Sequence, residues 1–186
     1  MKKNSVILGV ILTSLVVFAD KKNEHRHHEA HVHGGAVLNI AFDQLQGKVE
    51  FKGASEGVLG FEHEAKTEKD KKKLSQVISQ FESGMGSMVK FDASLGCVFS
   101  KEKIERVGEE NHEDHENQND DKHHHGEHSD FVALFNVLCK KEIKGTKLTI
   151  DFTQFKGVKD LDVTILVGDL QKSIEVQRKP VTVELL

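Results

Sequence analysis

Tryptophan and tyrosine are absent from this sequence, proline occurs once, and cysteine occurs twice among 186 residues. With phenylalanine as the only large aromatic residue, the stacking platforms typical of proteins that bind single-stranded nucleic acid are scarce. Basic side chains are also in the minority, with 26 against 30 acidic ones and a formal net charge of -4. A protein that binds nucleic acid through its phosphates needs the opposite balance. Nucleic acid is therefore not an expected partner.

A long apolar run occurs only near the N-terminus. Lys2 and Lys3 precede the apolar stretch 6–18, and Ala19 provides the small residue that a signal peptidase recognises before Asp20. This stretch is too short to cross about 30 Å of hydrocarbon as a helix, and no other stretch is apolar enough. The sequence predicts a signal peptide over residues 1–19, cleavage between Ala19 and Asp20, and an exported protein with no membrane span after cleavage.

The two cysteines, Cys97 and Cys139, each lie in a run typical of a β-strand. In an oxidising compartment an even number of cysteines favours a disulfide. The alternative is a pair of thiolate metal ligands, although neither a CxxC motif nor a neighbouring histidine accompanies them. Export makes the Cys97–Cys139 disulfide the expected state.

Alternating apolar residues predict a series of strands. The stretches 36–42 and 48–52 form a predicted hairpin, with Gln46 and Gly47 in its turn. Pro180 places the last apolar run at a sheet edge, because proline cannot donate a ladder hydrogen bond. The remaining predicted strands cover 94–107, 131–139, 147–152, 161–167, 174–177 and 181–183.

One stretch has the spacing of an amphipathic helix, with apolar residues at positions 74, 77, 78 and 81. Thr67 and Asp70 suit its start, and Gly84 and Gly86 predict its end. The fold class predicted from these elements is α+β: a mostly antiparallel β-sheet with one main helix packed on it. These elements are predicted to form a single domain over residues 35–186.

Histidine is concentrated to an unusual degree. Of 12 histidines, 11 lie in the two stretches 25–33 and 112–128. Residues 20–34 are predicted to be a flexible arm, and the stretch 109–130 has no aliphatic side chain that could be buried. Such a stretch cannot offset the entropy of ordering, so we expect a disordered insert between two strands.

Neutral imidazole is a common ligand of zinc, copper and nickel, and interleaved carboxylates attract cations to it. Both stretches are therefore predicted to bind metal. An HxH pair just before a strand, such as His31 and His33, presents two rings on one side. His63, outside both stretches, is open to two interpretations, as a ligand or as a structural hydrogen-bonding residue. The predicted ligands are His25, His27, His28, His31, His33, His63, His112, His115, His123, His124, His125 and His128.

The motifs HVHGGAVLNIA at 31–41 and GFEH at 60–63, with Lys66 and Thr67 at the helix start, resemble the ZrgA-type periplasmic zinc-uptake proteins. The resemblance extends over nearly the whole chain after the predicted signal peptide, and departs from the family's Pro-rich tail, which is reduced to Pro180. It implies a periplasmic, non-enzymatic protein that binds Zn(II) and assists its import, with components of a zinc ABC importer as partners.

Two other functions remain open. One is a zinc-dependent periplasmic enzyme in which His31, His33 and His63 hold the metal and Glu62 or Glu64 acts as the base. The sequence contains no HExxH motif to support it. The other is nickel or copper buffering, because unstructured polyhistidine discriminates poorly among late divalent metals. Cu(I) is disfavoured, because the sequence has only three methionines and both cysteines are expected to be oxidised.

Overall fold

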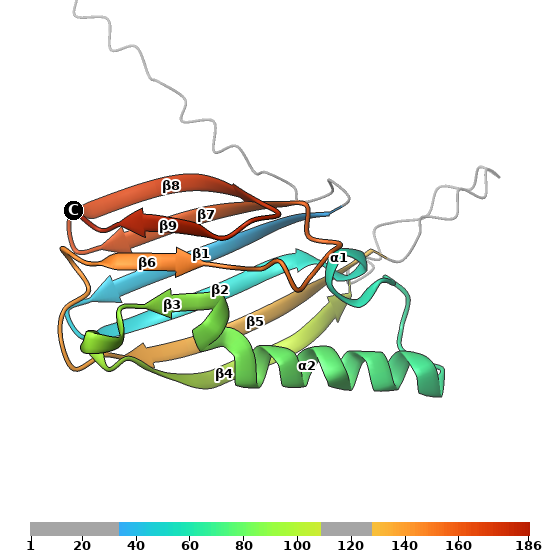
Figure 1. Cartoon of the computed structure of the whole chain (residues 1–186). Coiled ribbons are helices and arrows are strands. Elements are labelled where there is room, and N and C mark those ends of the chain that lie inside the picture. The colour runs from blue at the N-terminus through green and yellow to red at the C-terminus, as the bar shows by residue number, and fades with distance from the viewer. Residues whose placement is uncertain (1–33, 109–127) are drawn as a thin grey trace, which may run out of the picture.

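A computed structural model describes residues 34–108 and 128–186, which form two β-sheets and one long helix (Figure 1). The larger sheet has six strands: β1 Gly35–Asp43, β2 Gln46–Ala54, β4 Val98–Gly108, β5 Ser129–Leu138, β7 Asp160–Val167 and β8 Leu170–Gln177. The smaller sheet contains β3 Val89–Phe91, β6 Lys147–Ile150 and β9 Val181–Glu184. The helices are α1 Ser55–Leu59, α2 Glu68–Met88 and the 3-10 turn η1 Ala93–Leu95. The predicted α+β class is confirmed.

The strand order of the larger sheet is β4-β5-β2-β1-β7-β8, and that of the smaller sheet is β3-β6-β9. All pairs are antiparallel except β1 and β7, which run parallel. The predicted hairpin is formed by β1 and β2, and β9 pairs with β6 alone, at the edge predicted from Pro180. The parallel pair could not be predicted from alternation, because alternation does not reveal which strands become neighbours.

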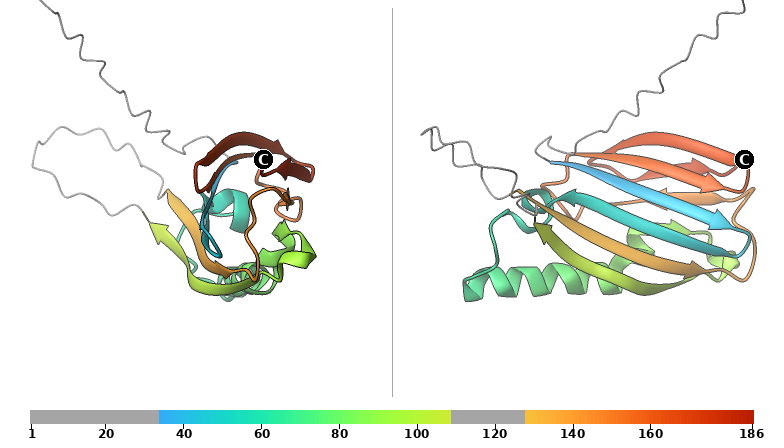
Figure 2. Two further views of the ribbon diagram at one scale, coloured as in Figure 1. Left: turned by 90° about the vertical axis from the view of Figure 1, so that its left-hand side faces the viewer. Right: turned by 180° about the vertical axis from the view of Figure 1, so that it is seen from behind.

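The core lies between the larger sheet, the smaller sheet and α2, and Figure 2 shows the larger sheet curving around it. Inward positions alternate with exposed ones along β1, where Leu38 and Ile40 are buried. The centre is aromatic. Phe81 of α2 lies 5.1 Å from the ring of Phe51 and 5.0 Å from that of Phe131. These contacts hold the helix against the sheet.

Helix α2 starts where the sequence predicts and ends later. Thr67 is its N-cap, with the side-chain oxygen accepting from the backbone N–H of Asp70. The predicted end at Gly84 and Gly86 is wrong, because the helix continues to Met88. Met85 and Met88 are buried in the core, and this burial outweighs the roughly 1 kcal/mol that each glycine costs in a helix.

Two local predictions also need correction. The β1–β2 turn is at Gln44 and Leu45, whereas Gly47 belongs to β2. A Cβ at Gly47 would lie 2.4 Å from the Phe42 ring, so glycine is required there for close packing across the strands. The predicted strand 94–107 begins only at Val98, because its first residues form η1, which is capped by the side chain of Asp92.

A disulfide joins Cys97 and Cys139, as predicted. The two cysteines lie just outside β4 and β5 rather than within them. Because β4 and β5 are paired along their length, the disulfide ties together two strands that are already neighbours. The predicted signal peptide and its Ala19–Asp20 cleavage site lie outside the described residues. Within the described ranges, no helix has the length and apolar character needed to cross a membrane.

Candidate metal-binding end of the sheet

One end of the six-stranded sheet carries the attachment points of both histidine-rich stretches. Strand β1 begins at Gly35, directly after the first stretch, while Gly108 at the end of β4 pairs with Ser129 at the start of β5. Only β2 lies between β1 and β5, so the two attachment points are separated by two strand spacings, about 10 Å. Strand topology therefore brings together the attachment points of two stretches that are far apart in the sequence.

The start of β1 is held at this end by close backbone contacts. The carbonyl of Gly34 accepts a hydrogen bond from the backbone N–H of Lys159 at 2.8 Å. A Cβ on Gly157 would lie 2.4 Å from the carbonyl oxygen of Gly57 in α1, and one on Gly34 would lie 2.9 Å from the carbonyl oxygen of Gly157. At this glycine junction, formed by Gly34, Gly57 and Gly157, the start of β1, α1 and the loop before β7 meet without side chains between them.

Glu62, in the loop between α1 and α2, is held by three residues from the β4–β5 hairpin. Its carbonyl oxygen accepts from the hydroxyl of Ser129 at 2.8 Å and from the guanidinium of Arg106. Its carboxylate lies 2.9 Å from Nδ1 of His128. Ser129 is itself buried, so this polar contact is shielded from solvent. The loop is thereby fixed to the strands from which the second histidine-rich stretch extends.

The second described histidine, His63, follows Glu62 directly. Its Nδ1 lies 3.0 Å from the backbone carbonyl of Glu64, and its ring stacks on Phe61 with the centroids 4.8 Å apart. A carbonyl oxygen can only accept, so Nδ1 of His63 carries the proton of this hydrogen bond. In the neutral ring, the lone pair is then on Nε2, the nitrogen that can coordinate a metal.

These contacts have the form of the outer-shell partners that orient metal-binding histidines. Such a histidine typically gives its other ring nitrogen to a carboxylate or a backbone carbonyl. The carboxylate of Glu62 holds Nδ1 of His128, and the carbonyl of Glu64 holds Nδ1 of His63. In both rings Nδ1 is engaged by an oxygen, so coordination of a metal would use Nε2.

Within residues 34–108 and 128–186, no three His, Cys, Asp or Glu side chains converge into a set that could hold a metal ion. A metal site at this end would need ligands beyond the described residues. The other predicted ligands lie outside the described residues: His25, His27, His28, His31, His33, His112, His115, His123, His124 and His125. The structure thus neither joins His63 to the predicted His31 and His33 pair nor separates them.

The sequence alone does not reveal the hydrogen-bonded group around Glu62. Ser129 and Asp130 fall within the predicted disordered insert 109–130, whereas both belong to β5. Asp130 forms an ion pair with Lys52 of β2 at 2.9 Å. The alternation of apolar residues places Arg106 in a strand but does not predict its hydrogen bond to Glu62. No local signal marks this group, because its members contact residues 44 to 67 positions away in the sequence.

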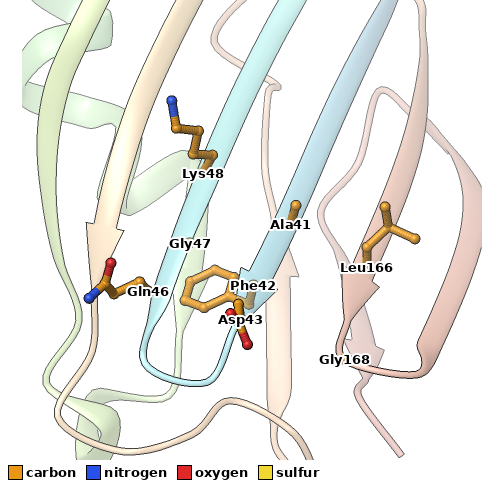
Figure 3. A pocket seen from close by; sticks show the side chains of 8 residues that line it. All are labelled: Ala41, Phe42, Asp43, Gln46, Gly47, Lys48, Leu166 and Gly168. Atoms are coloured by element: carbon orange, nitrogen blue, oxygen red, sulfur yellow. The ribbon is translucent and has the colours of Figure 1, made fainter.

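Two hollows in the described surface differ in chemistry. The one at the opposite end of the sheet is lined mostly by apolar and small groups from the β1–β2 and β7–β8 turns, including Phe42 and Leu166 (Figure 3). The other, about 640 Å³, lies between the Glu62 loop and the start of α2. It is lined by Phe61 and His63 together with three lysines of α2. Only the second hollow is at the candidate metal-binding end.

Asp70 also lines this second hollow, and hydrogen bonds keep its carboxylate charged. The Thr67 hydroxyl donates to this carboxylate at 2.6 Å. This hydrogen bond is the main reason that the pKa of Asp70 lies below its ordinary value, and nearby His63 and Lys69 lower it further. The start of α2 therefore carries a fixed negative charge beside its lysines.

The family model of the ZrgA family zinc uptake proteins matches residues 30–185 of the chain. The match includes the glycine junction, the Glu62 loop, the β4–β5 hairpin and the disulfide. The sequence has no significant match among curated proteins.

Proposed function

The chain belongs to the ZrgA family of zinc uptake proteins, and from this premise we propose that it captures Zn(II) in the periplasm and assists its delivery to a zinc importer. It is proposed to act as a binding protein rather than an enzyme. Zinc is its cargo, held by the two histidine-rich stretches and by the described end of the sheet to which they are attached. The Cys97–Cys139 disulfide supports an exported protein, because such bonds persist in oxidising compartments.

The observation that carries the proposal is that both described histidines are tied to the Glu62 loop, His63 as part of it and His128 through the Glu62 carboxylate. His63 and His128 each have Nδ1 held by an oxygen acceptor, the pattern of zinc-binding histidines with an outer shell. Both lie at the end of the sheet to which the two histidine-rich stretches are attached. We propose that His63 and His128 contribute Nε2 to a site completed by His31 and His33, and that the ligands at positions 112–125 add weaker capacity.

The difference in affinity follows from preorganisation. The Glu62 loop is fixed by hydrogen bonds to Ser129 and Arg106, so little freedom is lost when a metal binds there. Ligands on a segment without apolar side chains must lose conformational entropy on binding. The site at the sheet is therefore the tighter one, and the segment supplies exchangeable capacity suited to capture and transfer.

The first experiment is calorimetric titration of the metal-free protein with zinc, nickel and copper. Replacing the five histidines at 112–125 with asparagine should lower the number of bound zinc ions while leaving the tightest binding event in place. The triple variant His31→Ala/His33→Ala/His63→Ala should lose that tightest event. If it still binds its first zinc as tightly as the parent, the proposed site is wrong. Tighter binding of copper would not decide the cargo, because copper(II) binds most nitrogen ligands more tightly than zinc does.

A second experiment isolates the orienting carboxylate. Glu62→Gln should weaken the tightest zinc binding by roughly 10- to 100-fold, the usual loss when an outer-shell partner is removed. Glu64→Gln is the matched control, because the Glu64 carboxylate pairs with Lys66 at 3.3 Å and only its backbone contacts His63. Equal losses in both variants would show a general effect of charge on zinc affinity and contradict the outer-shell role of Glu62.

A further inference from the structure

A second feature of the same end is a concentration of positive charge in an otherwise acidic protein. Lys69, Lys72 and Lys73 line the hollow of about 640 Å³ between the Glu62 loop and α2, together with Gln76. Their spacing places them on one face of the helix. They lie in the first turns of α2, where the helix dipole adds positive potential.

The lysines that line the hollow differ from their neighbours. Lys66 pairs with Glu64 and Lys71 pairs with Glu68, whereas Lys69, Lys72 and Lys73 form no ion pair with any described residue. The nearest carboxylate in the hollow, that of Asp70, already accepts the Thr67 hydroxyl as part of the helix cap. The hollow is therefore a cationic surface without a matching set of anions among the described residues.

The chain contains an anionic segment attached beside this surface. Residues 109–127 hold eight carboxylates and one lysine. The segment joins Gly108 to His128, and His128 contacts Glu62, whose neighbours Phe61 and His63 line the hollow. Half of its 19 residues can reach roughly 30 Å when extended, so the start of α2 is within range. Such a short tether also gives a high effective concentration.

We propose that the basic hollow formed by Lys69, Lys72 and Lys73 binds the acidic segment 109–127 in the metal-free protein, and that zinc bound to the segment releases it. The release step rests on the proposed function, because it requires that the segment binds zinc. The eight carboxylates and one lysine give the segment a net charge of -7, so each zinc ion, with its two positive charges, weakens the attraction that holds the segment in the hollow. By thermodynamic linkage, docking then weakens zinc binding and zinc weakens docking by the same factor.

A nitroxide label on Gln118→Cys in the full chain tests the docking, because the two native cysteines are joined in a disulfide. In the metal-free protein at low salt, the amide signals of residues 69–76 should lose most of their intensity. The Lys69→Gln/Lys72→Gln/Lys73→Gln variant should recover it, and so should the parent at high salt, which screens exposed charges. The matched control, Lys90→Gln/Lys140→Gln/Lys141→Gln, removes three exposed lysines elsewhere and should leave the broadening unchanged.

Broadening that persists in the Lys69/Lys72/Lys73 variant or at high salt would overturn the docking, because it would reflect the tether alone. Suppose that an added acidic peptide shifts these amide signals while the label on the segment does not broaden them. The occupant of the hollow is then an external acidic partner, and the proposal is wrong. Broadening that survives saturating zinc would overturn the release step. Calorimetry on the same sample measures zinc binding and so separates the two proposals. Zinc binding without docking contradicts the docking alone and leaves the proposed function intact. Docking without zinc binding contradicts the proposed function.

Discussion

The two ends of the six-stranded sheet are stabilised by different means. At the end where the histidine-rich stretches attach, Glu62 is held by hydrogen bonds, and glycine backbones pack directly on one another. At the opposite end, the Cys97–Cys139 disulfide ties β4 to β5, and the paired residues Val98 and Leu138 are exposed. Placing the covalent tie at the far end keeps both sulfur atoms away from the candidate metal ligands. It also holds the hairpin together across the long insertion at its other end.

The largest effect is expected from removing the Cys97–Cys139 disulfide. Cys97→Ala/Cys139→Ala removes a link between residues 42 apart, which in the chain-entropy model lowers the free energy of unfolding by about 4 kcal/mol. Urea unfolding monitored by circular dichroism measures this loss. Because the disulfide is remote from His63 and His128, zinc stoichiometry of the folded variant should equal that of the parent. A loss of bound zinc would contradict the separation of the two ends.

A smaller effect is expected from overfilling the glycine junction at the metal-binding end. In Gly157→Ala the new Cβ would lie 2.4 Å from the carbonyl oxygen of Gly57, so the backbone must move. We expect a loss of about 1–3 kcal/mol in the free energy of unfolding. Unlike the cysteine variant, it should also weaken the tightest zinc binding, because the start of β1 is displaced. Unchanged zinc affinity would show that the junction is structural only.

Gly84→Ala is the matched glycine control and should have the opposite sign. Gly84 lies within α2, and a Cβ there would meet only the end of the Met88 side chain, at 3.8 Å. Alanine should therefore stabilise the helix by up to about 1 kcal/mol. Thermal unfolding under the same conditions should show a higher midpoint with unaltered zinc binding. A lower midpoint would indicate that the helix bends or packs more closely at Gly84 than the structure shows.

The smallest effects are expected on the stability of the protein in acid, to which one aspartate at each end of the sheet contributes. The Thr67 hydroxyl lowers the pKa of Asp70, and the hydrogen bond from Ser94 lowers the pKa of Asp92, which caps η1. A carboxylate whose pKa is lowered by folding stabilises the folded state when the pH is above its pKa in the unfolded chain, about 3.9. This stabilisation is lost as the pH falls through the pKa of the folded state.

Asp70→Asn and Asp92→Asn should therefore each make stability less dependent on pH below about 4, with little additional change between pH 5 and 7. Urea midpoints measured at intervals from pH 3 to 7 report this slope. If either variant keeps the parent's slope over the acid range, the corresponding carboxylate is not the group responsible.

Local sequence is a good guide where the determining contact is local. The helix start at Thr67 and Asp70 depends on a hydrogen bond between residues three apart, and the sequence predicts it correctly. The predicted helix end at Gly84 and Gly86 is wrong, because burial of Met85 and Met88 comes from strands and loops distant in the sequence. The same distinction explains why alternation predicts β1 but not its parallel pairing with β7.

By itself, the sequence determined the strand periodicity, the helix cap and the disulfide partners, and it predicts metal binding by the histidine-rich stretches. These depend on residue type and on neighbours close in the chain. Only the tertiary structure decided that Glu62 contacts His128, 66 residues away, and that three lysines of α2 share a hollow with His63. Strand order and backbone packing determine such contacts, and a side-chain pattern carries no information about which strand ends lie next to each other.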